Sequence, residues 1–147
     1  MNIRIKTFQE LELSELYDLL ALRCQVFVVE QDCPYLDPDG KDHKAWHVLG
    51  FKDDKLVAYT RIFRPGDYFE ECSIGRVVVA ESERKFGFGK DIMQASIDFI
   101  YEQLGEVEIS LSAQKYLLKF YRDLGFRERG EPYLEDGIPH MSMVKKI

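Results

Sequence analysis

Two neighbouring runs of sequence decide the fold, IGRVVVA at residues 74–80 and RKFGFGK at residues 84–90. The first run is almost continuously apolar, which is typical of a central strand covered on both of its faces. The second run contains two glycines and leads into an apolar stripe at helical spacing, Met93, Ile97, Ile100 and Leu104. We therefore expect a strand, a turn over residues 81–88, and a helix that ends at Gly105.

The glycine-rich turn has the composition of an anion site. Glycine lets the backbone approach a ligand closely, and the free amides at a helix N-terminus favour phosphate oxygens. Arg84, Lys85 and Lys90 add positive charge in a chain whose formal net charge is -6. A structural turn with solvated basic side chains would look the same, so this segment alone leaves both interpretations open. The motifs G-x-x-x-x-G-K-[ST] and G-x-G-x-x-G are both absent, which argues against nucleoside triphosphates and nicotinamide cofactors.

Apolar periodicity predicts the other elements. A strand is expected over residues 2–7, followed by a helix that starts near Gln9 or Ser14. The core-facing stripe of this helix is expected to be Leu13, Leu16, Tyr17, Leu20, Cys24 and Phe27. Further strands are expected at 46–52, 56–63, 107–111, 126–129 and 140–146, with a helix at 116–124 that stops at Gly125.

The resulting order, β-α-β-β-β-α-β-α-β-β, predicts an α/β fold with a mixed sheet. No internal repeat or long linker divides the sequence, so we expect a single domain over residues 1–147.

Composition narrows the class of protein. The chain has 147 residues, of which 46% are hydrophobic and 31% charged, which is typical of a soluble globular domain. The acidic balance argues against a nucleic-acid partner, and no window of about 20 apolar residues could cross a membrane. The three cysteines are far apart and form no C-x-x-C, so we expect a reducing, cytoplasmic location.

Two motifs resemble those of a known family. Arg84-x-x-Gly87-x-Gly89, placed after residues 74–80, resembles the coenzyme A pyrophosphate loop [QR]-x-x-G-x-[GA] of the GCN5-related N-acetyltransferases (GNAT). FYRDLGF at residues 120–126 resembles the FY..-G-F helix end of the same family. Segments at 22–23, 26–31, 33–35, 39–42 and 136–140 are similar to the ElaA-type branch. The resemblance covers almost the whole chain and implies the GNAT acyl-CoA N-acyltransferase fold.

The resemblance also implies a function. It points to an acetyl-CoA-dependent N-acetyltransferase that acts on a primary amine of a small molecule or peptide by direct attack on the thioester. The backbone of the loop would hold the pyrophosphate, and residues 77–79 would pair with the pantetheine arm and offer an amide to the thioester carbonyl. The cofactor-binding residues predicted in this way are Val77, Val78, Val79, Arg84, Lys85, Phe86, Gly87, Phe88, Gly89, Lys90 and Gln114.

Individual residues differ in how closely they match the family. Tyr121 occupies the position of the general acid that protonates the departing thiolate, although helical spacing alone would also fit a core tyrosine. Gln114 stands near the place where many members use Asn to contact the pantetheine arm, so it departs from the family pattern there. Residues 30–46 are expected to shape the acceptor site. Arg61 and Arg76 would bind an acceptor carboxylate or pair with nearby Asp and Glu.

Several alternatives stay open. The chain could bind coenzyme A without catalysis, as a sensor, or could use a longer acyl donor, since Arg23, Phe27 and the acidic loop loosely resemble acyl-homoserine lactone synthases. The general base is not assigned among its polar candidates, which are Glu30, Glu71, His47 and His140.

The sequence offers few ligands for a metal site and one candidate for a reactive thiol. His43 and His47 have H-x-x-x-H spacing near Cys33, but the surrounding segment is rich in Pro and Gly and no C-x-x-C completes a zinc set, so we expect no metal. Cys24 is expected in the core, and Cys33 is the one thiol placed to react. A homodimer is possible through aromatic side chains that we expect to be exposed, Tyr68, Phe69 and Tyr133.

Overall fold

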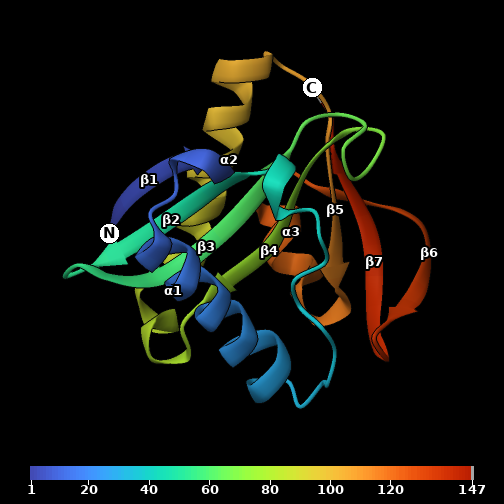
Figure 1. The fold of residues 1–147 in the computed structure, drawn as a ribbon. Helices are drawn as coiled ribbons and strands as arrows, with labels where there is room; N and C mark the ends of the chain where they lie inside the picture. Colours follow the sequence, from blue (N-terminus) through green and yellow to red (C-terminus); the bar gives the residue numbers. More distant parts are fainter. Residues whose placement is uncertain (147) are drawn as a thin grey trace.

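A computed structural model describes residues 1–146, in which seven strands form one sheet in the order β1-β2-β3-β4-β5-β7-β6 (Figure 1). All neighbouring strands are antiparallel except β4 and β5, which are parallel. The strands are β1 Asn2–Thr7, β2 Trp46–Lys52, β3 Lys55–Phe63, β4 Cys72–Val79, β5 Ile109–Gln114, β6 Arg127–Glu135 and β7 Ile138–Lys145. The helices are α1 Leu13–Arg23, α2 Phe88–Leu104 and α3 Leu118–Asp123. The predicted element order and the mixed α/β sheet are confirmed.

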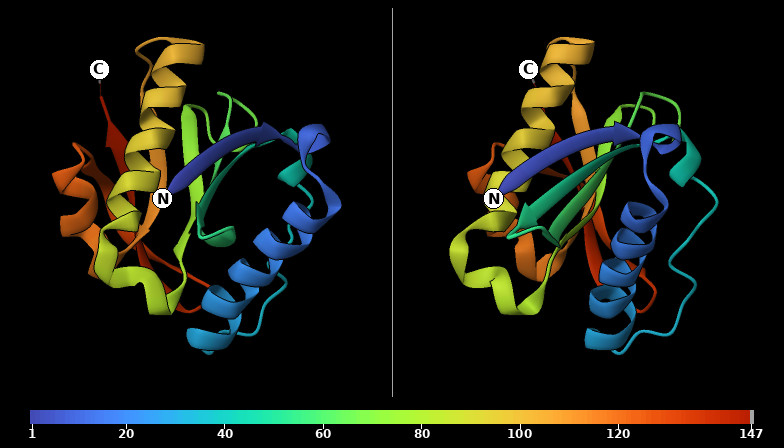
Figure 2. Two further views of the ribbon diagram at one scale, coloured as in Figure 1. Left: turned by 90° about the vertical axis from the view of Figure 1, so that its left-hand side faces the viewer. Right: turned by 60° about the vertical axis from the view of Figure 1, so that its left-hand side comes forward.

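Helices cover both faces of the sheet. Figure 2 shows the strands between α1 on one side and α2 on the other. Val78 belongs to the apolar cluster on the α1 side, whereas Val77 and Val79 pack against the cluster that contains α2. Because successive side chains of a strand point to opposite faces of the sheet, both faces of β4 are covered. The prediction from the apolar run at residues 74–80 is therefore confirmed.

The predicted stripe of the first helix is wrong in part. The side chains of Leu13 and Tyr17 are 87% and 75% exposed, and the buried positions of α1 are Glu15, Leu19 and Arg23. Two of these three carry charge, so an apolar pattern could not identify the buried face. Glu12, not Ser14 or Gln9, caps the start of α1.

A π-helical segment, Cys24–Glu30, follows α1 without a break. Wider turns change the direction in which successive side chains point. Cys24 and Phe27 are accordingly only partly buried, while Val26 is buried.

The C-terminal boundaries differ from expectation by a few residues. β5 begins at Ile109, and the helix expected at 116–124 is a 3₁₀ turn, Lys115–Leu117, followed by α3. β6 and β7 are longer than predicted because Asp136 and Gly137, both with positive φ, form a two-residue turn between them. Within residues 1–146, no helix combines the length and apolarity that crossing a bilayer requires.

Candidate active site

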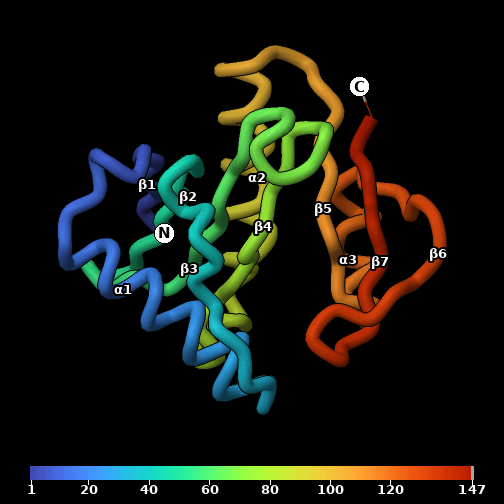
Figure 3. Tube along the Cα trace, turned by 45° about the vertical axis from the view of Figure 1, so that its right-hand side comes forward, coloured from blue at the N-terminus to red at the C-terminus, as the bar shows by residue number. Residues whose placement is uncertain are grey.

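β4 and β5 separate soon after they begin. Their parallel pairing is limited to Cys72 with Ile109 and Ser73 with Ser110, and Figure 3 shows the two traces diverging beyond this point. The edge of β4 that faces β5 therefore has no strand partner from Ile74 onward. Such an edge presents free N–H and C=O groups to any extended ligand that enters the gap.

A β-bulge lies in the middle of this free edge. Tyr59 of β3 pairs with Val78, and Arg61 pairs with Gly75, so Thr60 stands opposite two residues, Arg76 and Val77. Arg76 has a φ of 50°, a left-handed value that is unusual for a residue other than glycine. Bulges of this kind re-aim backbone groups and are common beside active sites.

A cavity of about 850 Å³ occupies the gap between β4 and β5. This volume lies in the range of small-molecule and cofactor sites. Most of the predicted site residues line it, namely Val77, Val78, Val79, Arg84, Gly87, Gly89, Lys90, Gln114 and Tyr121.

Three predicted residues do not line the cavity. Phe88 is 8% exposed and packs in the core, and the ring of Phe86 lies under the ammonium group of Lys52 at 3.9 Å. Lys85 extends over the edge of the same Phe86 ring, with 5.4 Å between its ammonium and the ring centroid. Lys85 is nevertheless exposed, so its ammonium group as well as the backbone amides of the loop is open to a ligand.

The glycine loop has room for an anion. Gly87, with a φ of 74°, ends the 3₁₀ segment Glu81–Phe86 and caps the N-terminus of the 17-residue helix α2. A Cβ on Gly87 would meet no atom within 4 Å, whereas a Cβ on Gly89 would lie 3.5 Å from Phe120. The free amides and the positive end of the helix dipole thus open onto the cavity without a side chain in front of them.

Two side-chain bridges cross the mouth of the cavity. Arg84 donates to both carboxylate oxygens of Glu30, at 2.6 and 2.8 Å, and its Nε donates to the carbonyl of Val79 at 3.2 Å. Gln31 and Gln114 exchange amide hydrogen bonds of 3.2 and 3.3 Å. The adjacent residues Glu30 and Gln31 thus connect the end of the π-helical segment to the loop and to β5.

Tyr121 reaches the cavity from α3. Its side chain is 5% exposed and contacts the rings of Phe120 and Phe126 edge-on. Burial raises the pKa of its hydroxyl above the ordinary value of 10.0. The group therefore stays protonated at neutral pH, as a proton donor must.

The four candidates for the base have different surroundings. Glu30 is paired with Arg84, and Glu71 is paired with Arg129 at 2.8 Å. His47 is fully buried, and burial lowers its pKa; its ring nitrogens contact the hydroxyl of Tyr59 and the carbonyl of Asp42. Only His140, on β7, is both a cavity-lining residue and outside an Arg pair.

Glu135 is a functional candidate that the sequence did not reveal. Its carboxylate lies 3.2 Å from Nε2 of His140 and lines the cavity. In the sequence Glu135 precedes Asp136 and Gly137, a composition that is typical of a turn and carries no sign of a proton acceptor.

A buried ionic network holds the segment before β2. Arg23 donates to Asp37 and Asp42 at 2.7 and 2.8 Å, and Arg61 donates to Asp42 at 2.9 Å. Arg61 also donates to Asp39, and Arg76 pairs with Asp37. Arg61 and Arg76 thus pair with aspartates, which was one of the two roles expected for them. The network fixes residues 37–42 beside the cavity.

The remaining expectations concern metal and association. Among residues 1–146 no group of three His, Cys, Asp or Glu side chains is arranged to hold a metal ion, and Cys33 donates to the carbonyl of Asp136 at 3.3 Å. Tyr68 and Phe69 line a small cavity beside β4, and the Tyr68 ring packs against the rings of Phe63 and Phe69. A role for them in a homodimer is still a prediction.

Comparisons with known proteins agree with this geometry. Residues 29–147 match the model of the acetyltransferase (GNAT) domain. Protein ElaA of Escherichia coli is 44% identical over 140 residues, which cover 94% of this chain and 92% of ElaA. The crystal structure of ElaA superposes with a TM-score of 0.92 over 99% of both chains, at 41% identity.

Two further solved structures are similar. An acyl-CoA N-acyltransferase from Pseudomonas aeruginosa has a TM-score of 0.92 at 37% identity, with 99% of each chain covered. A GNAT family acetyltransferase from Elizabethkingia anophelis, solved with acetyl-CoA bound, has a TM-score of 0.67 at 16% identity, again over 99% of each chain, which shows a shared fold.

Proposed function

The chain belongs to the GNAT acetyltransferase family, in its ElaA-like branch, and we propose that it is an acetyl-CoA-dependent N-acetyltransferase that acts on a primary amine. The observation that carries this proposal is that one cavity joins three features. They are the unpaired edge of β4, the glycine loop at the start of α2, and the hydroxyl of Tyr121.

The donor would lie along this cavity. Amides of the loop between Lys85 and Lys90, with the dipole of α2, favour the pyrophosphate. The edge of β4 from Val77 to Val79 offers backbone groups to the amides of the pantetheine arm. The bulge beside Arg76 leaves a backbone amide outside the regular pairing of β3 and β4. This amide would donate to the thioester oxygen as negative charge develops on that oxygen. The solved acetyl-CoA complex of a protein with this fold supports the choice of donor.

The chemistry requires a free amine and a protonated leaving group. An acceptor ammonium first loses one proton to a base, and its lone pair then attacks the thioester carbon. The C–S bond breaks as Tyr121 donates its proton to sulfur. The amide nitrogen gives up a second proton, which restores the Tyr121 hydroxyl, and the proton on the base passes to solvent. The products are an N-acetyl amine and coenzyme A.

A direct experiment separates the proposal from its alternatives. Purified protein is titrated with coenzyme A by calorimetry, and N-acetyl products are then measured by mass spectrometry across a panel of primary amines. Reading the acetylated product, with a no-amine control, excludes donor hydrolysis. Binding without product on any amine would favour the sensor, and retention of longer acyl-coenzyme A species through purification would favour another donor.

The compartment and partners follow from the same proposal. Cys24, Cys33 and Cys72 are unpaired within the described residues, which fits a reducing compartment, and we place the reaction in the cytoplasm. The partner is a small-molecule or peptide amine.

A further inference from the structure

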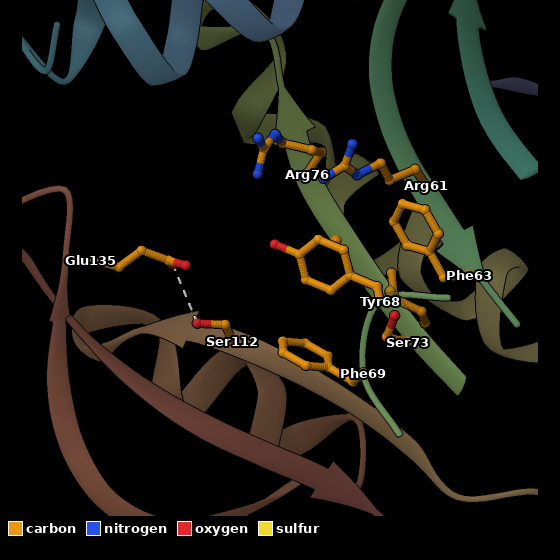
Figure 4. A pocket seen from close by; sticks show the side chains of 10 residues that line it. Arg61, Phe63, Tyr68, Phe69, Ser73, Arg76, Ser112 and Glu135 are labelled. Atoms are coloured by element: carbon orange, nitrogen blue, oxygen red, sulfur yellow. Dashed lines mark hydrogen bonds between the residues drawn. The ribbon is translucent and has the colours of Figure 1, made fainter. Parts of the chain in front are cut away.

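A second cavity, of about 60 Å³, opens beside the bulge (Figure 4). Its apolar walls are the rings of Phe63, Tyr68 and Phe69, and its polar groups include Ser73, Ser112 and Glu135. Because Tyr68, Gly75, Arg76, Ser112 and Glu135 also line the large cavity, the two cavities adjoin each other. The small cavity adjoins the first half of β4, whereas the glycine loop follows its last residue. It therefore lies on the far side of the bulge from the loop.

The basic groups of this small cavity are already neutralised. Arg61 contacts Asp39 at 2.6 Å and Asp42 at 2.9 Å, and Arg76 contacts Asp37 at 2.9 Å. With Arg23, three guanidinium groups face three carboxylates in one network. No positive charge is left over to attract an anionic acceptor.

The carboxylate of Glu135, by contrast, has no Lys or Arg partner among the described residues. Its contacts are His140 Nε2 at 3.2 Å and the hydroxyl of Ser112 at 3.4 Å. Nδ1 of His140 lies 2.7 Å from the carbonyl of Ile138, which can only accept, so Nδ1 carries a proton. In a neutral His140, Nε2 would then carry a lone pair that faces Glu135. With His140 neutral, the hydroxyl of Ser112 at 3.4 Å is the one side-chain donor to the carboxylate among the described residues, and no cation is paired with it.

Two buried polar atoms on the same cavity also lack partners. The hydroxyl of Ser73 and Nε of Arg61 have no hydrogen bond, although each residue is 1% exposed. Buried groups of this kind nearly always find a partner. The volume of the cavity corresponds to about four water molecules, so a polar ligand end of a few atoms would fit.

We propose that Glu135 binds the ammonium group of the acceptor in this small cavity and takes its proton, so that the substrate is a cationic primary amine on a slender, unbranched arm. The inference rests on the proposed function, for which it names the missing base. The N–H bond of the ammonium breaks, an O–H bond forms on Glu135, and the freed lone pair attacks the thioester carbon. Later steps and the release of the proton to solvent are those given above.

The cavity walls explain the slender arm. Phe63 is 1% exposed and Ile74 is 2% exposed, so both walls are held in the core, and a cavity of about 60 Å³ between such walls favours a slender group over a branched one. The hydroxyl of Tyr68 points across the space toward Glu135 (Figure 4).

Other ionisable groups around Glu135 contribute little net charge. Arg61 and Arg76 are neutralised as described, and Lys41 and Asp136, which both line the large cavity, carry opposite charges. The groups facing Glu135 from the elements packed around it are Lys41, Arg61, Tyr68, Arg76, Tyr133, Asp136 and His140.

The first test is binding, which does not depend on turnover. n-Butylammonium chloride is titrated into the protein at pH 7 while backbone amide shifts of Gly75 and Ser112 are followed by NMR. Saturable shifts in the wild type that disappear in Glu135→Gln support the proposal, provided that the variant keeps a dispersed spectrum. Equal binding by both proteins, or equal shifts with neutral n-butanol, would overturn it.

The second test is transfer from acetyl-CoA to n-butylamine and tert-butylamine. Glu135→Gln is expected to lower kcat/KM for n-butylamine about 100-fold at pH 7, with a deficit that shrinks toward the amine pKa near 10.4, where free amine is abundant. Glu131→Gln, an exposed change on the same strand, is expected to match the wild type. The wild type should prefer n-butylamine to tert-butylamine.

The outcomes separate the two proposals. Transfer that is insensitive to Glu135 at every pH would overturn the inference and leave the acetyltransferase intact. Binding that depends on Glu135, without transfer to any amine of the panel, would support the cation site and reject the acetyltransferase.

Discussion

Arg84 donates two hydrogen bonds to the carboxylate of Glu30, at 2.6 and 2.8 Å, across the mouth of the cavity. The pair fixes a basic residue of the glycine loop against the end of the π-helical segment. An incoming pyrophosphate would meet a guanidinium whose charge is already neutralised and a carboxylate that repels it. We therefore expect Glu30 to oppose donor binding.

Glu30→Gln is accordingly expected to tighten coenzyme A binding several-fold, because it removes one negative charge close to the phosphates. Calorimetry at low and moderate salt measures the effect, which should diminish as salt increases. Glu128→Gln is the matched control, since Glu128 forms a similar pair with Arg122 away from the cavity. Weaker binding by Glu30→Gln would mean that the pair supports the site.

Gly87 and Gly89 provide the second prediction. Valine at Gly87 would have to adopt a φ of 74°, and valine at Gly89 would place a branched side chain beside the Phe120 ring, with its Cβ at the ordinary contact distance of 3.5 Å. We expect the double change to reduce coenzyme A affinity at least tenfold. Gly130→Val, at another positive φ but remote from the cavity, controls for backbone strain. A folded double variant with normal affinity would reject the loop as the pyrophosphate site.

Much of this site could be predicted from the sequence, because its signals are local. The apolar run of β4 and the two glycines before α2 lie within a few residues of one another, and their geometry follows from short-range backbone preferences. The ionic network could not be predicted. Arg23 meets Asp37 and Arg61 meets Asp39 across 14 and 22 residues of sequence, and pattern rules assign charged side chains to the surface.

Glu135 was missed for a related reason. Its value as a proton acceptor depends on β7 bringing His140 beside it and on β4 placing Ser73 across the cavity. None of these distances has a signature in a single sequence.

The buried network leads to a stability prediction. Burial alone would raise the pKa of Asp42, but hydrogen bonds and charge from Arg23 and Arg61 outweigh it and hold that pKa below 3.8. A carboxyl whose folded pKa is depressed contributes stability above its unfolded pKa and loses it as pH falls. We expect the urea midpoint to fall as pH drops below about 4, and less so in Asp42→Asn.

Asp42→Asn itself is expected to destabilise the fold by about 3 kcal/mol at pH 7, because it leaves two buried guanidinium groups short of charge. Urea unfolding followed by circular dichroism measures this loss. Asp18→Asn, on the exposed face of α1, should change stability by less than about 0.5 kcal/mol. Equal stability of the two variants would show that the network does not stabilise the fold.

Tyr121 gives the most direct prediction about chemistry. Its hydroxyl, whose pKa burial raises above the ordinary 10.0, is protonated throughout the neutral pH range and can donate to the departing thiolate. Tyr121→Phe removes that donor without opening a cavity, so we expect kcat to fall about 100-fold with little change in donor affinity or thermal stability. Tyr101→Phe, on α2 and outside the cavity lining, should leave kcat unchanged. If turnover by Tyr121→Phe equals that of the wild type, sulfur receives its proton from another group, and Tyr121 has only the packing role that its helical spacing also allowed.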